Sequence, residues 1–464
     1  MKINRIDVIW NYTATFFKIS SSLLLIPFIL HKLSSEDVGI WTIFSSISSL
    51  VFLVDFGFNS SFSRNVTYIF SGVSTLKKDG HEISLENEKE ISFELLKGLL
   101  EAMRWFYSRI SALIFVALSI IGTLYLVNIL SHYQGNKINI YTAWFLFISI
   151  NTYNLYTLYY DALLEGKGLI RISKKITILG HVIYLLVALI FIYCGYGLAA
   201  LVGAQFLSVI IIRTISNKKF FTPEIINKLD NVNSANKKEI LKAIYPNAMK
   251  YGVTSIGGFL IQKSSIFIGS LFLPLSSIAS FGIAKQILDS TVGIANIALI
   301  TFLPQISRLR ILGNNQMIKF ICVRGLLIAN LTLIIGSIII ISYGNFFLHI
   351  IKSNTFFNQN VILIMAISSF ISLNSGLCGA IISTKNYIPF MKPSLISGIC
   401  TILLLIVLSK FTNLGLVGMA MAPGVIDLCY QGWKWPLVVF KDLDIKFKDF
   451  IGVLKRNMNN TYID

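Results

Sequence analysis

The sequence has few of the residues that form metal sites and disulfide frameworks. Of its 464 residues, 5 are cysteine, 5 are histidine and 22 are acidic. None of the cysteines forms a CxxC pair, so the spacing predicts neither a disulfide framework nor a zinc site. The histidines are scattered along the chain in the same way. We therefore predict no metal centre and no cofactor.

Charged residues of either sign are also scarce, and hydrophobic residues dominate. They make up 13% and 55% of the chain, and the mean hydropathy is +0.71. These values lie outside the range of soluble domains. A membrane-spanning helix needs about 20 apolar residues. Twelve stretches qualify, at residues 9–30, 38–58, 110–130, 140–160, 176–194, 197–213, 251–273, 278–300, 325–343, 359–382, 394–411 and 414–433.

The basic residues predict the orientation of these spans. If both termini are cytoplasmic, the inner loops and termini hold 33 of the 40 lysines and arginines, and the outer loops hold four. Cytoplasmic loops carry such an excess in membrane proteins. The net charge of +18 is then a signal of topology, and we predict no nucleic-acid partner, because no basic soluble domain carries it.

The second half of the sequence repeats features of the first half. Residues 33–40 resemble residues 275–283, and residues 58–64 resemble residues 302–308, at offsets of 242 and 244. Further along, Gly197-Leu198 matches Gly415-Leu416 at an offset of 218. With six spans in each half, the two repeats are parallel, and substrate sites in such transporters lie between the halves near the membrane midplane.

The predicted organisation follows from this repeat. We expect an all-α polytopic membrane protein of 12 transmembrane helices in two parallel six-helix halves. The predicted parts are an N-terminal half at 1–216, a cytoplasmic linker at 217–245, a C-terminal half at 246–434 and a cytoplasmic tail at 435–464. A leucine-rich amphipathic stretch at 95–106 is interpreted as a helix lying on the inner membrane surface.

Three lysines fall inside predicted spans, where a charge is costly and indicates function. They are Lys18, Lys263 and Lys285. In the first span Asn11 lies on the same helical face as Lys18, and in the seventh span Gln262 adjoins Lys263. We predict these five residues to bind substrate. For each lysine, a purely structural role in helix packing is the alternative.

Three aspartates complete the set of charges in or near the spans. Asp289 is four residues from Lys285, so the two side chains lie on one helix face. Asp289 could neutralise Lys285 while the substrate site is empty, or the two could form a permanent salt bridge that fixes helix packing. Asp427 is a candidate proton or sodium site, or the partner of a lysine. Asp55 lies at the end of the second span, and its two alternative roles are that of a membrane-interface residue and that of an ion-coupling residue.

The excess of lysine predicts the sign of the substrate's charge. Lysines in a cavity of low dielectric constant attract anions strongly. A phosphate- or pyrophosphate-bearing substrate fits, and the membrane setting favours one linked to a lipid. No motif specifies proton or sodium coupling.

Several segments resemble bacterial polysaccharide and O-antigen flippases. Residues 24–64 carry most of the likeness, through Ile26-Pro27-Phe28, the 33–41 turn and Val54-Asp55-Phe56-Gly57-Phe58. Tyr245-Pro246 and Leu303-Pro304 also look like that family. It belongs to the multidrug/oligosaccharidyl-lipid/polysaccharide exporter superfamily, with the multidrug and toxin extruders and the lipid II flippase.

The resemblance implies a fold and a role. The fold would be MATE-like, and the protein would flip undecaprenyl-pyrophosphate-linked oligosaccharide from the inner to the outer leaflet of the bacterial cytoplasmic membrane by alternating access. The glycan would serve O-antigen, lipopolysaccharide, capsule or exopolysaccharide assembly. The implied partners are this lipid-linked oligosaccharide, membrane lipid, a polysaccharide polymerase and chain-length machinery.

Three other classes of membrane protein compete with this interpretation. A multidrug extruder of the same superfamily, which exports cations, would share the architecture. Its cavity should be lined by the carboxylates of Asp and Glu, whereas lysines are in excess here. A membrane-embedded polymerase or glycosyltransferase usually needs a large outer loop, and the longest one here is predicted at 344–358 with one charge, so we predict no enzyme. A major-facilitator symporter would show Gly followed by Asp-Arg after the second span, and residues 59–70 lack it.

Overall fold

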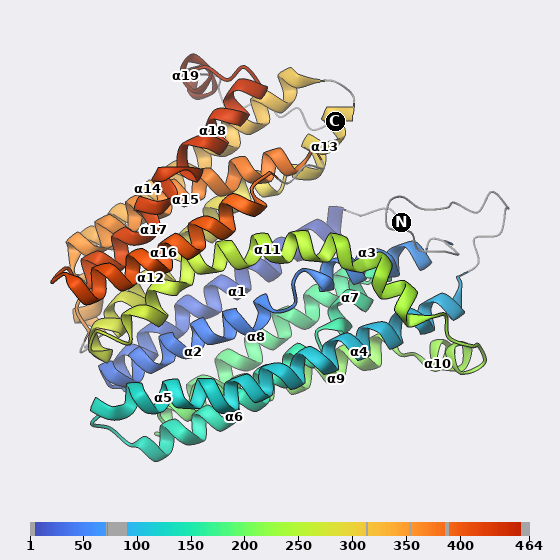
Figure 1. The fold of residues 1–464 in the computed structure, drawn as a ribbon, viewed down its shortest axis with the longest axis horizontal. Coiled ribbons are helices and arrows are strands. Elements are labelled where there is room, and N and C mark those ends of the chain that lie inside the picture. The colour runs from blue at the N-terminus through green and yellow to red at the C-terminus, as the bar shows by residue number, and fades with distance from the viewer. Residues whose placement is uncertain are drawn as a thin grey trace. The chain divides into compact units, whose positions relative to one another are not determined.

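The computed structural model describes residues 5–70, 72, 91–311, 314–351, 355–385 and 389–455, and within them the regular structure is helical throughout. The chain forms two compact units, Met1–Ile256 and Gly257–Asp464. The boundary between them falls inside the helix α11 (Lys237–Gly269), shown in Figure 1. The predicted all-helical membrane fold is confirmed.

Unit 1 is a bundle of long helices joined by short turns. A π-helical segment, Leu118–Gly122, joins α4 to α5 without a break, and a 3-10 turn, Leu130–His132, follows α5. Its helices are α1 (Arg5–Lys32), α2 (Ser35–Leu53), α3 (Phe58–Phe70), α4 (Phe93–Ala117), α5 (Thr123–Ile129), α6 (Lys137–Tyr156), α7 (Tyr159–Gly166), α8 (Ile170–Tyr193), α9 (Leu198–Phe220), α10 (Pro223–Asp230) and the first part of α11.

Unit 2 has a similar set of helices and ends in two shorter ones. Beyond the second part of α11 its helices are α12 (Leu275–Ile300), α13 (Leu303–Ile311), α14 (Asn315–Ile350), α15 (Gln359–Ser383), α16 (Met391–Phe411), α17 (Leu416–Cys429), α18 (Gln431–Asp442) and α19 (Phe447–Lys455).

All twelve predicted spans lie on helices, although three of these helices are weaker candidates. Among the described residues, nine helical segments are long and apolar enough to cross a membrane. The other three predicted spans correspond to α6 and α11, which carry more polar side chains, and to α17, which has 14 residues. The predicted end of the second span is wrong, because α2 stops at Leu53 and α3 begins at Phe58.

The leucine-rich stretch at 95–106 does not lie on the membrane surface as a separate helix. It forms the first half of α4, which continues directly into the third span. Leu96, Leu99 and Met103 are fully buried in a cluster with α3, α7 and α9. The periodicity correctly indicates a helix, but the apolar face packs against protein instead of lipid.

The connection predicted as a linker at 217–245 is structured. The end of α9, all of α10 and the start of α11 occupy it. Lys97 on α4 donates a hydrogen bond to the carbonyl oxygen of Val232 at 2.7 Å, and the amide of Ala235 donates to the carbonyl of Glu94 at 3.2 Å. This connection is therefore held against the N-terminal end of α4.

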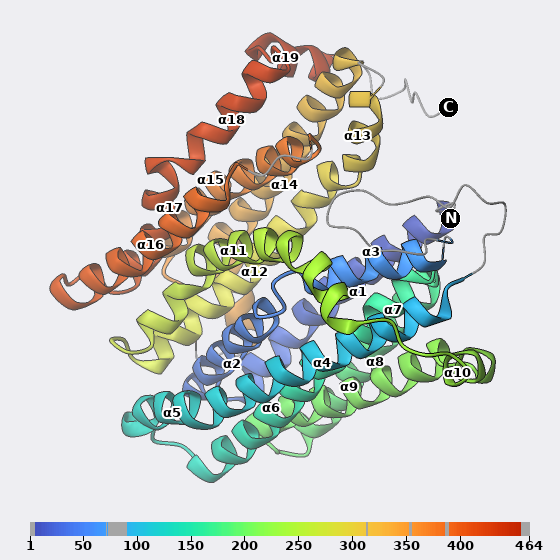
Figure 2. The same cartoon turned by 45° about the vertical axis from the view of Figure 1, so that its right-hand side comes forward.

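The two units share one pattern of helix neighbours around α6 and α15, as the sequence repeat predicts. In unit 1, α6 packs against α2, α4 and α9, and α9 packs against α8. In unit 2, α15 packs against α12, α14 and α17, and α17 packs against α16. Figure 2 lets the two sets be followed separately. The second helix of each set ends in a short turn that leads to a short helix, α3 or α13.

The repeated glycines at the start of α9 and α17 adopt the same unusual backbone conformation. Gly197 has φ 57° and ψ −137°, and Gly415 has φ 50° and ψ −123°. Residues with a Cβ rarely adopt this region, which is essentially restricted to glycine. The sequence match at an offset of 218 therefore reflects one turn used twice.

We expect Gly197→Ala and Gly415→Ala to destabilise the protein by similar amounts, about 1–3 kcal/mol each, because alanine is strained in this backbone region. Thermal unfolding in detergent measures the effect. Gly376→Ala in α15 is the control, since no atom of the described residues lies within 4 Å of the added Cβ and its φ is not positive. Unchanged stability in both test variants would contradict the shared-turn interpretation.

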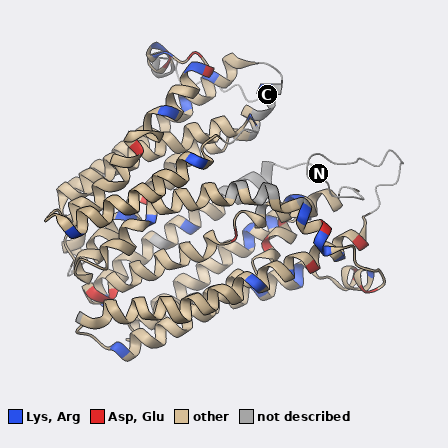
Figure 3. Ribbon diagram, in the orientation of Figure 1, with Lys and Arg blue, Asp and Glu red and all other residues tan. Residues whose placement is uncertain are grey.

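Within each unit, basic residues gather toward one end of the helices. Figure 3 shows their positions in unit 1 around α3, α7 and α10, and in unit 2 around α18 and α19, whereas the middle of each bundle holds few. The opposite end of unit 1 is held by acceptors from α2, since Tyr133 Oη donates to Asp37 at 2.6 Å and the Gln134 amide donates to Glu36 at 3.2 Å. Burial, and then its hydrogen bond to Asp37, raise the pKa of Tyr133, so it remains a donor at neutral pH.

Candidate functional site

Three charged side chains and one amide form a connected cluster in unit 2. Asp289 on α12 accepts from two lysines, from Lys263 Nζ at 2.8 Å and from Lys285 Nζ at 2.6 Å, each on a separate carboxylate oxygen. Lys285 also donates to Gln262 Oε1 at 3.3 Å. The structure thus joins four of the residues predicted from the sequence, and it gives Lys263 an interhelical partner.

The helical geometry explains why these residues meet. Lys285 and Asp289 are separated by four residues on α12 and therefore lie on one face. Gln262 and Lys263 come from the facing part of α11. The exposed fractions of the side chains are 28% for Lys263, 14% for Lys285 and 32% for Asp289, so the cluster is half-buried and accessible. One carboxylate faces two ammonium groups, which leaves an excess of one positive charge.

A small cavity of about 30 Å³, roughly the size of one water molecule, adjoins the cluster and is lined by both polar and apolar residues. Gln262 and Lys285 line one part of it, and Ser368, Ser369 and Ser372 of α15 line another. The serines were not among the residues predicted from the sequence. The sequence feature that could have identified them is the four-residue spacing of Ser368 and Ser372, which places both hydroxyls on one helix face.

Asp427 on α17 lies beside this cavity. It is buried, and its carboxylate accepts a hydrogen bond from Ser372 Oγ at 2.5 Å. Within the described part of the chain it forms no ion pair with a lysine, so the predicted pairing with a membrane lysine is not seen there. Ser372 connects the two features, because it lines the cavity and binds Asp427.

In unit 1, Lys18 lies on an exposed face of α1. No acidic side chain of the described residues pairs with it. One turn further, Ser21 Oγ donates to the Lys18 carbonyl and lies 3.5 Å from His181 Nδ1 on α8. The side chain of Asn11, the other residue predicted to bind substrate here, lies outside the described part of the structure.

Asp55 has partners that explain its position without an ion. It lies in the turn between α2 and α3, where Phe56 and Gly57 have φ values of 50° and 70°. Its carboxylate accepts from Tyr107 Oη at 2.6 Å and from the backbone amide of Asn59 at 3.1 and 3.2 Å. An acceptor at this place satisfies an unpaired amide at the start of α3.

We expect Asp55→Asn to lower the free energy of unfolding by about 1–3 kcal/mol, because a buried charged acceptor at a helix N-terminus is lost. Transport per folded molecule should stay unchanged. Thermal unfolding and a transport assay normalised to protein amount measure the two quantities. Asp230→Asn on the exposed surface of α10 is the control. Loss of transport at wild-type stability would instead assign Asp55 to ion coupling.

No protein-family model and no curated protein matches the sequence. Solved structures match along nearly the whole chain. An inward-facing multidrug resistance MATE family transporter of the MOP superfamily matches with a TM-score of 0.64 at 12% identity, over 96% of both chains. The lipid II flippase MurJ in an inward closed conformation matches with a TM-score of 0.62 at 14% identity, over 97% of this chain and 90% of that one. The chain has the MOP-superfamily fold.

A third MOP-superfamily structure also matches. It is a transporter from Pyrococcus furiosus, described by a reverse polarity of its binding pocket that suggests a different function, with a TM-score of 0.50 at 12% identity over 95% and 96% of the chains. These neighbours are transporters, and none is an enzyme by its description. Because a multidrug transporter and a lipid flippase match about equally well, the MOP fold does not select the substrate.

Proposed function

We propose that this protein is a transporter that flips an anionic, lipid-linked oligosaccharide, of the undecaprenyl-pyrophosphate type, by alternating access. The observation that carries the proposal is the Lys263–Asp289–Lys285 cluster, in which two lysines share one carboxylate. An anion can replace Asp289 as the partner of one of the two lysines, because the two ammonium groups carry one more positive charge than the carboxylate neutralises. A cation would meet net repulsion at the same place.

The chemistry of the cluster suggests how a pyrophosphate is held and released. When the site is empty, Asp289 holds both ammonium groups in position at 2.6 and 2.8 Å. A pyrophosphate that arrives accepts hydrogen bonds from the lysines, and such charge-assisted bonds are stronger than neutral ones. Asp289 then competes for the lysines and favours release. Gln262 and the α15 serines offer uncharged groups to sugar hydroxyls.

The neighbours agree with this proposal at the level of the fold. One is a lipid II flippase by its description, and another has a binding pocket of reverse polarity within the superfamily. A lysine-rich site in this fold fits a substrate of negative charge. We further propose a location in a bacterial cytoplasmic membrane, with the lysine- and arginine-rich ends of the helices on the cytoplasmic side. Glycan polymerase and chain-length proteins would then be the downstream partners.

A binding experiment separates this proposal from the multidrug alternative. A ligand that binds the folded state raises the unfolding temperature. We expect undecaprenyl pyrophosphate to stabilise the purified protein, and uncharged undecaprenol or a cationic dye to have no such effect. The Lys263→Gln/Lys285→Gln variant should lose the response to the pyrophosphate. Stabilisation by the dye alone would support a drug extruder instead.

A further inference from the structure

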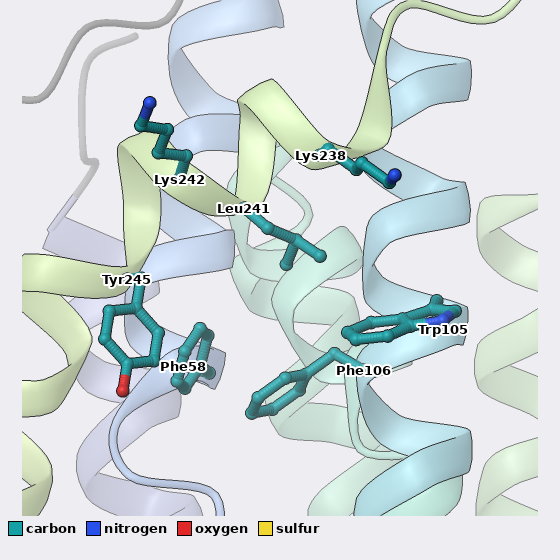
Figure 4. Close-up of a pocket in the computed structure, with 7 residues that line it drawn as sticks. All are labelled: Phe58, Trp105, Phe106, Lys238, Leu241, Lys242 and Tyr245. Carbon is teal, nitrogen blue, oxygen red and sulfur yellow. The ribbon is translucent and has the colours of Figure 1, made fainter.

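A second pocket lies in unit 1 and has a volume of about 600 Å³. Its lining comes from α3, α4 and the start of α11. Most of this lining is aromatic or aliphatic, and the polar exceptions are two lysines on α11. Figure 4 shows the residues, which are Phe58, Trp105, Phe106, Lys238, Leu241, Lys242 and Tyr245.

The aromatic residues form a fixed apolar surface. Phe58 is buried, and its ring centroid lies 3.9 Å from that of Phe106 and 6.3 Å from that of Tyr245. Trp105 and Tyr245 are 44% and 55% exposed. Tryptophan and tyrosine with this exposure are typical of the level where lipid headgroups meet the hydrocarbon core.

The two lysines provide positive charge at the edge of this apolar surface. Lys238 and Lys242 are four residues apart on α11 and both are exposed. In Figure 4 their side chains extend from the helix above the rings toward opposite sides. Within the described part of the chain neither ammonium group has an acidic partner, whereas nearby Lys228 is paired with Glu224.

The outer face of α4, together with the π-helical segment after it, extends the apolar surface along the predicted membrane span. Leu113, Val116 and Ile120 follow Trp105 on roughly the same helix face, and their exposed fractions are 63%, 54% and 57%. The pocket therefore has cationic groups at one edge, and Trp105 in its lining shares a helix face with these exposed apolar residues. A ligand that matches both features has an anionic head and a long apolar tail.

We infer that this pocket binds an anionic membrane phospholipid, with the phosphate near Lys238 and Lys242 and an acyl chain against Phe58, Phe106 and Trp105. Basic pockets between membrane helices bind the headgroups of anionic lipids in this way. A free phosphate ion would leave the 600 Å³ of apolar space unused. The site lies in unit 1, so the inference does not depend on the substrate proposed for the cluster in unit 2.

Native mass spectrometry of the purified full-length protein tests the inference. The probes are phosphatidylglycerol and phosphatidylcholine with identical acyl chains. Each lysine near a membrane surface contributes roughly fivefold to anionic-lipid affinity. We expect Lys238→Gln/Lys242→Gln to weaken one phosphatidylglycerol binding event by about 25-fold and to leave phosphatidylcholine binding unchanged.

The matched control is Lys218→Gln/Lys219→Gln, which removes the same charge from exposed lysines at the end of α9. It should bind phosphatidylglycerol as the wild type does. Equal weakening in both double variants would show a general charge effect and overturn the site, as would full retention in Lys238→Gln/Lys242→Gln. Displacement of phosphatidylglycerol by equimolar undecaprenyl phosphate would assign the pocket to the isoprenoid substrate and overturn the phospholipid assignment.

Discussion

Removing all charge from the lysine cluster is expected to abolish glycolipid transport while the protein still folds. The variant is Lys263→Gln/Asp289→Asn/Lys285→Gln, which keeps side chains able to hydrogen-bond and leaves no unpaired charge. Two charge-assisted hydrogen bonds to the pyrophosphate are lost, and together they correspond to at least about 100-fold in transport rate. The transport rate in proteoliposomes, normalised to the amount of protein, measures this loss.

The choice of variants separates substrate binding from packing. Single changes such as Lys285→Gln disturb Asp289 as well, so their effects will not be additive. Lys319→Gln/Asp449→Asn is the matched control, because it neutralises an ion pair of 2.8 Å in the same unit. The Lys319 hydrogen bond lowers the pKa of Asp449, so this pair is charged at neutral pH. Wild-type transport by the triple variant would make the cluster structural.

Alanine at Gly257 is expected to destabilise unit 2 severely, whereas alanine at the next residue is not. A Cβ at Gly257 would lie 2.6 Å from the backbone nitrogen of Leu395 and closer still to the Ser394 carbonyl. Because these are backbone atoms of α16, the two helices must separate, at a cost of about 3 kcal/mol. We expect a much lower unfolding temperature and less protein in the membrane.

Gly258→Ala is the matched control for this prediction. It makes the same chemical change one residue later in α11, where no atom of the described residues lies within 4 Å of the added Cβ. Alanine favours the helix over glycine by about 0.5–1 kcal/mol, so this variant should be as stable as the wild type or slightly more so. Equal behaviour of the two variants would contradict the close packing of α11 on α16.

The helical architecture could be predicted from the sequence because hydrophobic length and repeat are local signals. The paired glycines at 197 and 415 illustrate this, since the repeat places them at equivalent positions and their backbones agree. The four-residue spacing of Lys285 and Asp289 likewise predicts their common face, and the two side chains form an ion pair there. The first feature follows from the sequence repeat, and the second follows from the residue spacing within one helix.

Features that depend on a second helix could not be predicted in this way. The periodicity at 95–106 shows an apolar face without showing what covers it, and α3 and α7 cover it here instead of lipid. Asp55 has the sequence position of a charge at a span end, and its partner Tyr107 is 52 residues away. The α15 serines near Lys285 were missed for the same reason.

The most direct test of the proposed function is transport by the purified protein in liposomes, with two labelled substrates in parallel. One is a fluorescent undecaprenyl-pyrophosphate oligosaccharide and the other is a cationic dye. The proposal predicts movement of the glycolipid between leaflets, lost in the triple-neutral variant, and no transport of the dye. Transport of the dye without movement of the glycolipid would contradict it and place this chain among the drug exporters.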